Sequence, residues 1–427
     1  MKLAAKRSHD NPVLAAFIYD SVLKDAHFVG EDLHGNKRYA TQDYKHAEAS
    51  CLQLTHQLSS DNHTLSIFQK TIANVIEQTT LAQGYAISAE QESAIYAACE
   101  DRRLSVMVGR AGTGKTTSLK SIVRLHEMAG FTVVGMALSA EAARHLGEDA
   151  KITSKTLASN DVKWRRQEEI RESLKNESLN AIERRSLELK LADLSRFDFD
   201  KNTLAIVDEC GMIGTAMMNR LLAQIEKSGA KLFLVGDDRQ FKAIDAGDIF
   251  RKQLGIAKTL GGYSELTHIF RQQEKWMVEA SLHLSELDAH AALNMYHDQG
   301  CVHGRASEET ALVDIADLYM DRVASTRDSG LVITYTNESC NKLNAEIRSR
   351  LLSSQKISPV THTLKNSSFS VGDRILFLEN CYDPTIFSIK RLPVSKGTSV
   401  KSVRTIEKSQ KSLRGHIPYG LSAKHKF

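Results

Sequence analysis

Residues 109–116 read GRAGTGKT, a complete match to the phosphate-loop pattern G-x-x-x-x-G-K-[ST]. An apolar run, Leu104 to Val108, precedes this loop, and a helix-like stretch, Thr116 to Met128, follows it. A loop between a strand and a helix N-terminus points backbone N–H groups at phosphate oxygens, and glycines permit the close turn. The pattern and its context therefore predict a nucleotide-binding P-loop; the alternative is a glycine-rich turn that holds no nucleotide.

The residue types of this loop suit magnesium-ATP. We expect Lys115 to reach the β- and γ-phosphates and the Thr116 hydroxyl to ligate Mg²⁺. ATP and Mg²⁺ are therefore the predicted cofactors. The residues expected to bind the nucleotide in and beside the loop are Gly109, Ala111, Gly112, Thr113, Gly114, Lys115, Thr116 and Thr117.

Short β-branched runs alternate with helical segments from Ser88 to about Leu260. Strands that alternate with helices predict a parallel sheet covered on both faces. A phosphate loop on such a sheet predicts an α/β protein with a RecA-like P-loop NTPase core. The strand-like runs are Phe131 to Ala137, Leu204 to Val207 and Lys231 to Val235, and the helical segments are Ala142 to Leu146 and Met217 to Lys227.

Two acids, Asp208 and Glu209, end the second of these strand-like runs. We expect Asp208 to hold Mg²⁺ through its water shell, and Glu209 to orient and deprotonate the water that attacks the γ-phosphate. Adjacent acids at a strand end favour ATP hydrolysis and disfavour a P-loop kinase or a signalling GTPase, whose guanine motif N-K-x-D is also missing from the sequence. The alternative is a pair of acids that only caps a strand beside a turn.

Two further polar residues follow later strand-like runs. Gln240 ends the stretch that begins at Leu232, where it is placed to hydrogen-bond the γ-phosphate or the attacking water. Arg271, in the stretch Glu265 to Gln273, is a candidate arginine finger, a group worth roughly a thousandfold or more in phosphoryl transfer. Taken alone, Arg271 is better explained as a surface arginine. The predicted catalytic residues are Lys115, Glu209, Gln240 and Arg271, and the predicted metal ligands are Thr116 and Asp208.

These elements, in this order and at this spacing, resemble superfamily 1 DNA helicases of the RecD-like class, and in particular the helicase portion of TraA-type conjugative relaxase-helicases. The resemblance covers about Val29 to Asn380. Residues 87–91, ISAEQ, are similar to the family's L-S-x-x-Q adenine-binding element, which implies that Gln91 reads the base. Residues 235–240 are similar to the motif V-G-D-x-x-Q, with Asp238 where proline is usual.

The resemblance also implies a partner and a direction of movement. The family moves 5′ to 3′ along single-stranded DNA, and residues 134–139 and 154–159 are similar to the elements that lead into its DNA path. Other conjugation or DNA-processing proteins are further implied partners. Residues 369–380 resemble the G-D-R-[IV] stretch, but the later helicase motifs and a nicking domain are not recognised. The sequence therefore predicts a form that lacks the nicking domain and is truncated or divergent at its C-terminus.

The composition is that of a globular protein, with 427 residues, of which 42% are hydrophobic and 25% charged. This length suffices for two or three domains, and the composition excludes a disordered chain. The six cysteines form no C-x-x-C pair, which argues against zinc ribbons and disulfide scaffolds and fits a reducing cytoplasm. No apolar run approaches the roughly 18 residues of a membrane span, so we expect a cytoplasmic location without membrane insertion.

Four regions are predicted along the chain. A mainly helical N-terminal or linker region (1–85), with helix-like apolar spacing from Leu14 to Val22, precedes a first RecA-like domain (86–260). A partial second RecA-like domain (261–387) and a basic divergent tail (388–427) follow. In the second domain, strand-like Leu331 to Tyr335 and Asp373 to Leu378 flank a helix-like Ser339 to Leu351.

Two charged segments stand out. Mixed charges with apolar residues at helical spacing predict an exposed helix or helical hairpin inserted at 161–195, which is either a solvated face or a DNA-contacting arm. The tail from Ser388 carries ten Lys and Arg residues against one acid. Such a tail either contacts nucleic-acid phosphates without sequence preference or is merely solvated.

The function that these features favour is an ATP-dependent DNA helicase or translocase of a conjugative DNA transfer system, in a truncated form. Its ATPase activity would be coupled to single-stranded DNA. The alternative, from the class of binding proteins, is a remnant that binds nucleotide and DNA without productive turnover or unwinding.

Overall fold

The computed structural model describes residues 26–31, 37–62, 67–110, 112–176, 178–195, 198–240, 243, 247–272, 274–325, 331–364, 367–373, 375–377 and 423–425. These residues belong to two compact units, Met1–Met295 and Tyr296–Phe427, which are described separately. The helix-like spacing from Leu14 to Val22 and nearly all of the basic tail lie outside the described residues. Among the described helices, none is both long and apolar enough to cross a lipid bilayer.

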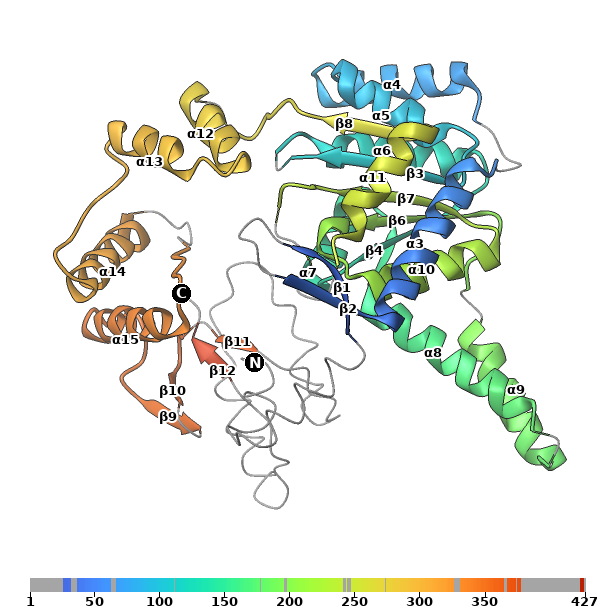
Figure 1. Cartoon of the computed structure of the whole chain (residues 1–427). Helices are drawn as coiled ribbons and strands as arrows, with labels where there is room; N and C mark the ends of the chain where they lie inside the picture. Colours follow the sequence, from blue (N-terminus) through green and yellow to red (C-terminus); the bar gives the residue numbers. More distant parts are fainter. Residues whose placement is uncertain are drawn as a thin grey trace. The chain divides into compact units, whose positions relative to one another are not determined.

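A six-stranded sheet forms the centre of the first unit (Figure 1). Its strand order is β5-β4-β6-β7-β3-β8, and every neighbouring pair is parallel, which confirms the predicted parallel sheet. The strand that precedes the P-loop, β3, is thus separated by β7 from the strand that ends in the two acids, β6. The strands are β3 (Leu104–Gly109), β4 (Thr132–Ala137), β5 (Thr153–Thr156), β6 (Thr203–Asp208), β7 (Lys231–Gly236) and β8 (Tyr263–Leu266).

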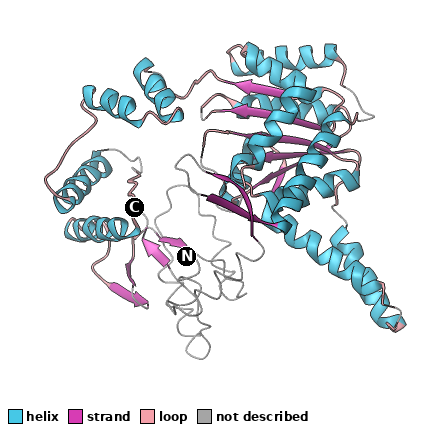
Figure 2. Cartoon of the chain, viewed as in Figure 1, coloured by secondary structure: helices cyan, strands magenta, loops and turns pink. Residues whose placement is uncertain are grey.

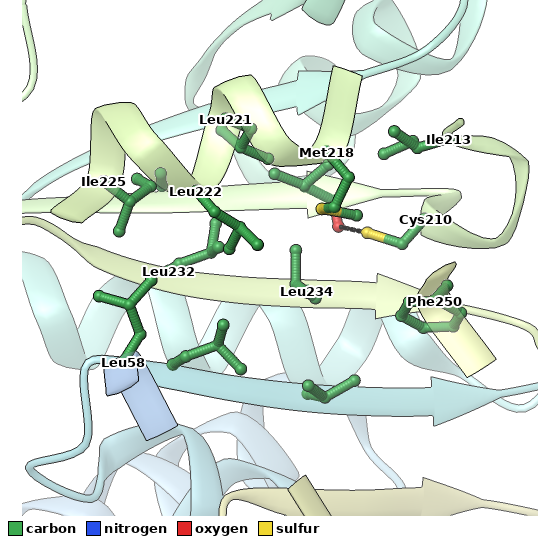
Figure 3. Close-up of a cluster of buried hydrophobic side chains, with 14 of the residues drawn as sticks. Leu58, Cys210, Ile213, Met218, Leu221, Leu222, Ile225, Leu232, Leu234 and Phe250 are labelled. Carbon is green, nitrogen blue, oxygen red and sulfur yellow. Dashed lines mark hydrogen bonds between the residues drawn. The ribbon is translucent and has the colours of Figure 1, made fainter. Parts of the chain in front are cut away.

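Helices cover both faces of this sheet, as predicted, and each face has its own hydrophobic core. Alternation along β7 shows the division, because Leu232 and Leu234 belong to one core and Phe233 and Val235 to the other. Figure 3 shows the first core, where Leu232 and Leu234 face Leu222 of α10. The helices on that side are α3 (Gln42–Ser60), α10 (Thr215–Ser228) and α11 (Ile249–Leu260); those on the other are α4 (Gln69–Gln83), α5 (Ala89–Cys99), α6 (Lys115–Met128) and α7 (Ala140–Ala150).

The predicted charged insertion is a helical hairpin, α8 (Leu157–Leu174) and α9 (Ala181–Ser195), which extends away from the sheet (Figure 1). Its distal helix α9 contributes no buried residue, which agrees with a solvated arm. The start of α8, in contrast, belongs to the core. There the buried carboxylate of Asp161 accepts hydrogen bonds from Arg220 and forms an ion pair of 2.8 Å with Arg165. The prediction of an exposed insertion therefore holds only for its distal part.

The N-terminal region, predicted to be mainly helical, also contains a β-hairpin. Strands β1 (Ala26–Glu31) and β2 (Lys37–Thr41) pair antiparallel before α3 begins. Phe28 and Tyr39 stack edge to face across the pair, with ring centroids 6.0 Å apart, and both side chains are exposed. Neither strand shows the alternation of apolar and polar residues that marks a half-buried strand, and where burial is described in β1, at residues 27–29, the side chains are exposed.

The second unit is built on two packed helices, α14 (Glu308–Ser325) and α15 (Asn337–Ser353). Two short antiparallel pairs accompany them, β9 (Thr361–Leu364) with β10 (Ser367–Ser370) and β11 (Ile375–Phe377) with β12 (Ala423–His425). Asp373 of the G-D-R stretch is buried and accepts hydrogen bonds from Arg348 Nε (3.1 Å) and the Ser370 backbone N–H (2.7 Å). Along the chain, α12 (Lys275–Ser285) belongs to the first unit, and α13 (Ala289–Asp298) contains the division between Met295 and Tyr296.

The predicted strand at Leu331–Tyr335 is wrong. Residues 331–334 have no regular secondary structure, and no described strand pairs with them. The alternation that suggested a strand is nevertheless present, since Leu331, Ile333 and Tyr335 are exposed while Val332 packs against the core of the second unit. A strand exists only where a neighbour accepts its backbone hydrogen bonds, and the described part of the second unit supplies no such neighbour.

A buried lysine at the start of β7 makes the stability of the first unit depend on pH. Burial lowers the pKa of Lys231 from 10.5 to about 8, although its ammonium donates a hydrogen bond to the Glu100 carbonyl. The unfolded chain keeps this proton up to pH 10.5, so the free energy of unfolding should rise by about 3 kcal/mol between pH 8 and 10.5. Below pH 8 the charged, buried form lowers stability.

We therefore expect Lys231→Met to increase the free energy of unfolding at pH 7 and to remove this rise. Urea unfolding of wild type and variant at several pH values from 7 to 9.5 measures the difference, in which other titrating groups cancel. Lys227→Met, at an exposed position of α10, is the matched control and should leave the pH dependence unchanged. Parallel pH profiles for wild type and Lys231→Met would contradict the expectation.

Candidate nucleotide-binding and active site

The P-loop leaves the carboxyl end of β3 and enters α6 at Lys115. Gly112 (φ +86°) and Gly114 (φ +78°) take left-handed backbone conformations that favour glycine. A Cβ on Gly112 would also overlap the Cβ of Arg271. Inside the loop, the buried Thr113 hydroxyl donates to the Arg110 carbonyl at 2.8 Å, which fixes the turn. The strand, loop and helix predicted for this segment are all present, while Ala111 lies outside the described residues.

The cationic end of Lys115 is held at the start of the same loop. Its Nζ donates to the Gly109 carbonyl at 2.8 Å. Thr116 and Thr117 lie half-buried in the first turn of α6, and the Thr117 N–H donates to the Gly114 carbonyl at 3.0 Å. The first turn of a helix presents unpaired N–H groups and the positive end of its dipole, which suits an anion such as a phosphate.

The two predicted acids end β6 close to Lys115. Burial raises the pKa of Asp208, while the hydrogen bond from the Glu209 N–H (2.8 Å) and the Lys115 charge act in the opposite direction. Burial also raises the pKa of Glu209, followed by the charge of Asp208, and the charge of Lys115 opposes this rise. A carboxylate with a raised pKa is a better proton acceptor, which is the property required of a general base.

The backbone at Glu209 is unusual. Its φ of +57° lies in the left-handed region, which a residue with a side chain adopts only when the surrounding structure imposes it. The chain continues into the short 3₁₀ helix η1 (Cys210–Met212), where a Cβ on Gly211 would lie 2.7 Å from the Asp237 carbonyl oxygen. η1 is thus packed so closely against the end of β7 that position 211 has room only for glycine.

Asp237, at the end of β7, is a third acid of this site that was not among the predicted residues. It is 5% exposed, its charge contributes to the raised pKa of Glu209, and its Oδ1 accepts the Arg239 N–H at 3.0 Å. The V-G-D sequence at a strand end was the available signal, because carboxyl ends of neighbouring parallel strands meet at one edge. Gln240 follows on the same turn and is exposed, with no described side-chain contact to the acids.

These oxygen donors fit a magnesium ion. The half-buried carboxylate of Asp208 accepts a hydrogen bond from the adjacent Glu209 N–H, and the hydroxyl of Thr116 lies in the first turn of α6. Carboxylate, hydroxyl, water and phosphate oxygens are the ligands that Mg²⁺ prefers. Within the described residues, no group of three or more His, Cys, Asp and Glu side chains suggests a separate metal centre.

Arg271 lies directly beside the P-loop. The Phe270 N–H donates to the Gly112 carbonyl at 2.8 Å, which places the next residue, Arg271, against Gly112. The Arg271 side chain is exposed, so it is available to a bound phosphate. Its loop follows β8, a strand predicted to belong to the second domain. The structure corrects this prediction, because β8 pairs with β3 in the sheet of the first unit.

Gln91 also contacts the P-loop, from the first turn of α5. Its Oε1 accepts the Ser88 N–H at 3.0 Å, the Ser88 hydroxyl accepts the Gln91 N–H at 3.2 Å, and its Nε2 donates to the Gly114 carbonyl at 3.3 Å. The amide is 4% exposed. Both ends of the side chain are thus engaged in capping α5 and supporting the loop, and the base-reading role of Gln91 stays a prediction.

The sheet and its P-loop define an α/β protein with a RecA-like core. The structure brings Lys115, Asp208 and Glu209 together at the carboxyl edge of the sheet, with Arg271 and Gln91 against the same loop. The chain belongs to a family described as AAA domain, whose match covers residues 86–307.

Comparison with individual proteins shows more specific similarities within this class. The conjugal transfer protein TraA of Agrobacterium fabrum is 30% identical over 348 residues, which are 80% of this chain and 28% of that protein. The ATP-dependent RecD2 DNA helicase of Deinococcus radiodurans is 31% identical over 44% of this chain and 22% of its own length. The chain is thus homologous to TraA and RecD-like proteins, which confirms the predicted resemblance, and it spans less than a third of either relative.

Among solved structures, the Pif1 helicase of Candida albicans matches 70% of this chain and 66% of its own, with 15% identity and a TM-score of 0.38.

Proposed function

We propose that this chain is the ATP-hydrolysing motor of a DNA helicase or translocase that acts in conjugative DNA transfer. The observation that carries the proposal is the convergence of Lys115, Asp208 and Glu209 at the carboxyl edge of the sheet, with Arg271 against the P-loop. The names of the TraA and RecD2 relatives supply the DNA substrate and the conjugative context. Single-stranded DNA, travelled 5′ to 3′, and other conjugation proteins are the proposed partners, in the cytoplasm.

Each residue has a distinct task in this proposal. The P-loop N–H groups and Lys115 bind the β- and γ-phosphates, and Thr116 and Asp208 hold Mg²⁺, which neutralises phosphate charge. Glu209, whose pKa burial raises, accepts the proton of the attacking water. Arg271 stabilises the charge that develops on the transferred phosphoryl group, and Gln240 senses the γ-phosphate.

A second candidate is nucleotide and DNA binding without unwinding. It is favoured by the segment 331–335, which is mostly apolar yet has no strand partner among the described residues. Translocation requires two domains that close around ATP, and a second sheet would be part of the closing domain. The domain limits predicted from the sequence, 86–260 and 261–387, would separate β8 from the sheet in which it pairs with β3, and the two compact units divide instead between Met295 and Tyr296.

ATPase assays with and without single-stranded DNA test the proposal, alongside strand displacement on a duplex with a 5′ overhang. We expect DNA-stimulated hydrolysis but no processive unwinding by this chain alone. DNA affinity should fall about tenfold or more between about 50 mM and 200 mM salt, because phosphate contacts dominate it. Lys115→Ala, purified in parallel, controls for contaminating ATPases, and deletion of residues 388–427 reports the contribution of the tail.

The outcomes separate the two candidates. Hydrolysis that exceeds the Lys115→Ala background supports the motor, whereas nucleotide binding without hydrolysis supports the binding protein. Efficient ATP-dependent unwinding would show that the second unit is complete in function, against the expectation drawn from segment 331–335.

A further inference from the structure

The loop that carries Arg271 connects β8 to α12 (Figure 2). Residues 267–270 lie between β8 and α12 without regular secondary structure. A flexible arginine would lose much of its value, because a misplacement of about 1 Å can cost about a hundredfold in rate. Some other group must therefore fix the backbone that precedes Arg271.

Glu90, in the first turn of α5, makes these contacts. Its Oε2 accepts the backbone N–H groups of Thr267 (2.7 Å) and His268 (3.1 Å), and its other oxygen accepts the Thr267 hydroxyl. One carboxylate thus satisfies three donors of the loop. Burial raises the pKa of Glu90, but the hydrogen bonds from Thr267 and His268 outweigh it and lower the pKa, so the group is ionised at neutral pH. Charge-assisted bonds of this kind are about twice as strong as neutral ones.

The contacts form a closed triangle. Glu90 holds the loop at Thr267 and His268, the next residue Gln91 holds the P-loop at Gly114, and Phe270 of the first loop donates to Gly112 of the P-loop. The three corners are separate in sequence, and each pair is joined directly. Phe270 is further supported by an edge-to-face contact with His268, whose ring centroid lies 4.5 Å away.

We infer that Glu90 is a positioning residue for ATP hydrolysis, which acts by holding the loop 267–271 so that Arg271 stands at the P-loop. The inference rests on the proposed ATPase function. It assigns Glu90 no contact with the nucleotide. Loss of Glu90 should therefore lower kcat with little change in KM, because the P-loop that binds the phosphates stays intact.

The test compares Glu90→Ala with Glu92→Ala, which removes an exposed acid from the same helical turn. We expect Glu90→Ala to reduce kcat about tenfold to a hundredfold, and Glu92→Ala to leave it unchanged. Glu90→Gln, which keeps an acceptor oxygen, should recover part of the loss. In an Arg271→Ala background, Glu90→Ala should have almost no further effect, since it acts through that side chain. A full additional loss in that background, or an unchanged kcat, would overturn the inference.

A second readout does not depend on ATPase activity. Trypsin cleaves after arginine, so release of the loop should speed cleavage after Arg271 in Glu90→Ala but not in Glu92→Ala, with thermal melting confirming that both variants fold. Equal cleavage rates would refute the positioning role. If the wild type does not hydrolyse ATP, only the proposed function is refuted. The proteolysis comparison would still decide whether Glu90 holds the loop.

Discussion

Lys115→Ala should abolish binding of magnesium-ATP. The ammonium of Lys115 is held at the P-loop by the Gly109 carbonyl and is the cation of this loop that faces Asp208 and Glu209. Without this ammonium, the ATP phosphates lose their principal positively charged partner. The negative charges of Asp208 and Glu209 then repel the phosphates with no nearby cation to offset them. A loss of at least about a hundredfold in affinity is expected, since a charge-assisted contact of this kind is worth several kcal/mol in a partly buried site.

Isothermal titration calorimetry with ATP and Mg²⁺ measures this loss. Lys120→Ala is the matched control, because Lys120 lies on the same helix α6 and is exposed. The control should bind like the wild type. Equal affinities for wild type and Lys115→Ala would remove the P-loop assignment.

Glu209→Gln should separate binding from chemistry. The amide keeps the size of the side chain and its left-handed backbone, but it cannot accept the proton of the attacking water. We expect turnover to fall by at least about a hundredfold while ATP affinity is retained or improved, because one negative charge near the phosphates is lost. The raised pKa of the wild-type carboxylate is the physical basis of its role as base.

Single-turnover hydrolysis and calorimetry on the same preparation distinguish the two effects. Glu226→Gln, at an exposed position of α10, controls for the change from carboxylate to amide. Turnover that is unchanged in Glu209→Gln would exclude this residue from the mechanism, and Asp237 would then be the next acid to test.

Local sequence patterns were sufficient to predict the P-loop and the acidic residues of the site. The P-loop, its flanking strand and helix, and the acids after β6 are contiguous in sequence, so their chemistry can be read from spacing alone. The parallel sheet followed from the alternation of strand-like and helical segments, and β4, β6 and β7 all lie where the sequence placed them.

Features that depend on distant contacts could not be predicted. Glu90 joins the site only because α5 packs beside the loop after β8, whereas Asp237 follows β7 directly and carried a signal at a strand end in the sequence. Gln91 was predicted to read a base. Its bonds with Ser88 form a local capping box, whereas its contact with the Gly114 carbonyl needs the folded P-loop. At 331–335 the pattern of a strand is present without its partner. Hydrophobic periodicity and residue propensity describe one segment, whereas strand pairing depends on the fold of the whole chain.

The strand order also bears on how the protein is made. β3 pairs with β7 and β8. Leu104 can therefore pair with Leu232, and Val106 with Tyr263, only after most of the first unit has been synthesised. Strand pairing between residues so far apart along the chain slows folding, and an apolar strand is prone to aggregation until it pairs. On the ribosome, the P-loop strand emerges early and remains without either neighbour, and the first unit closes its sheet late in translation.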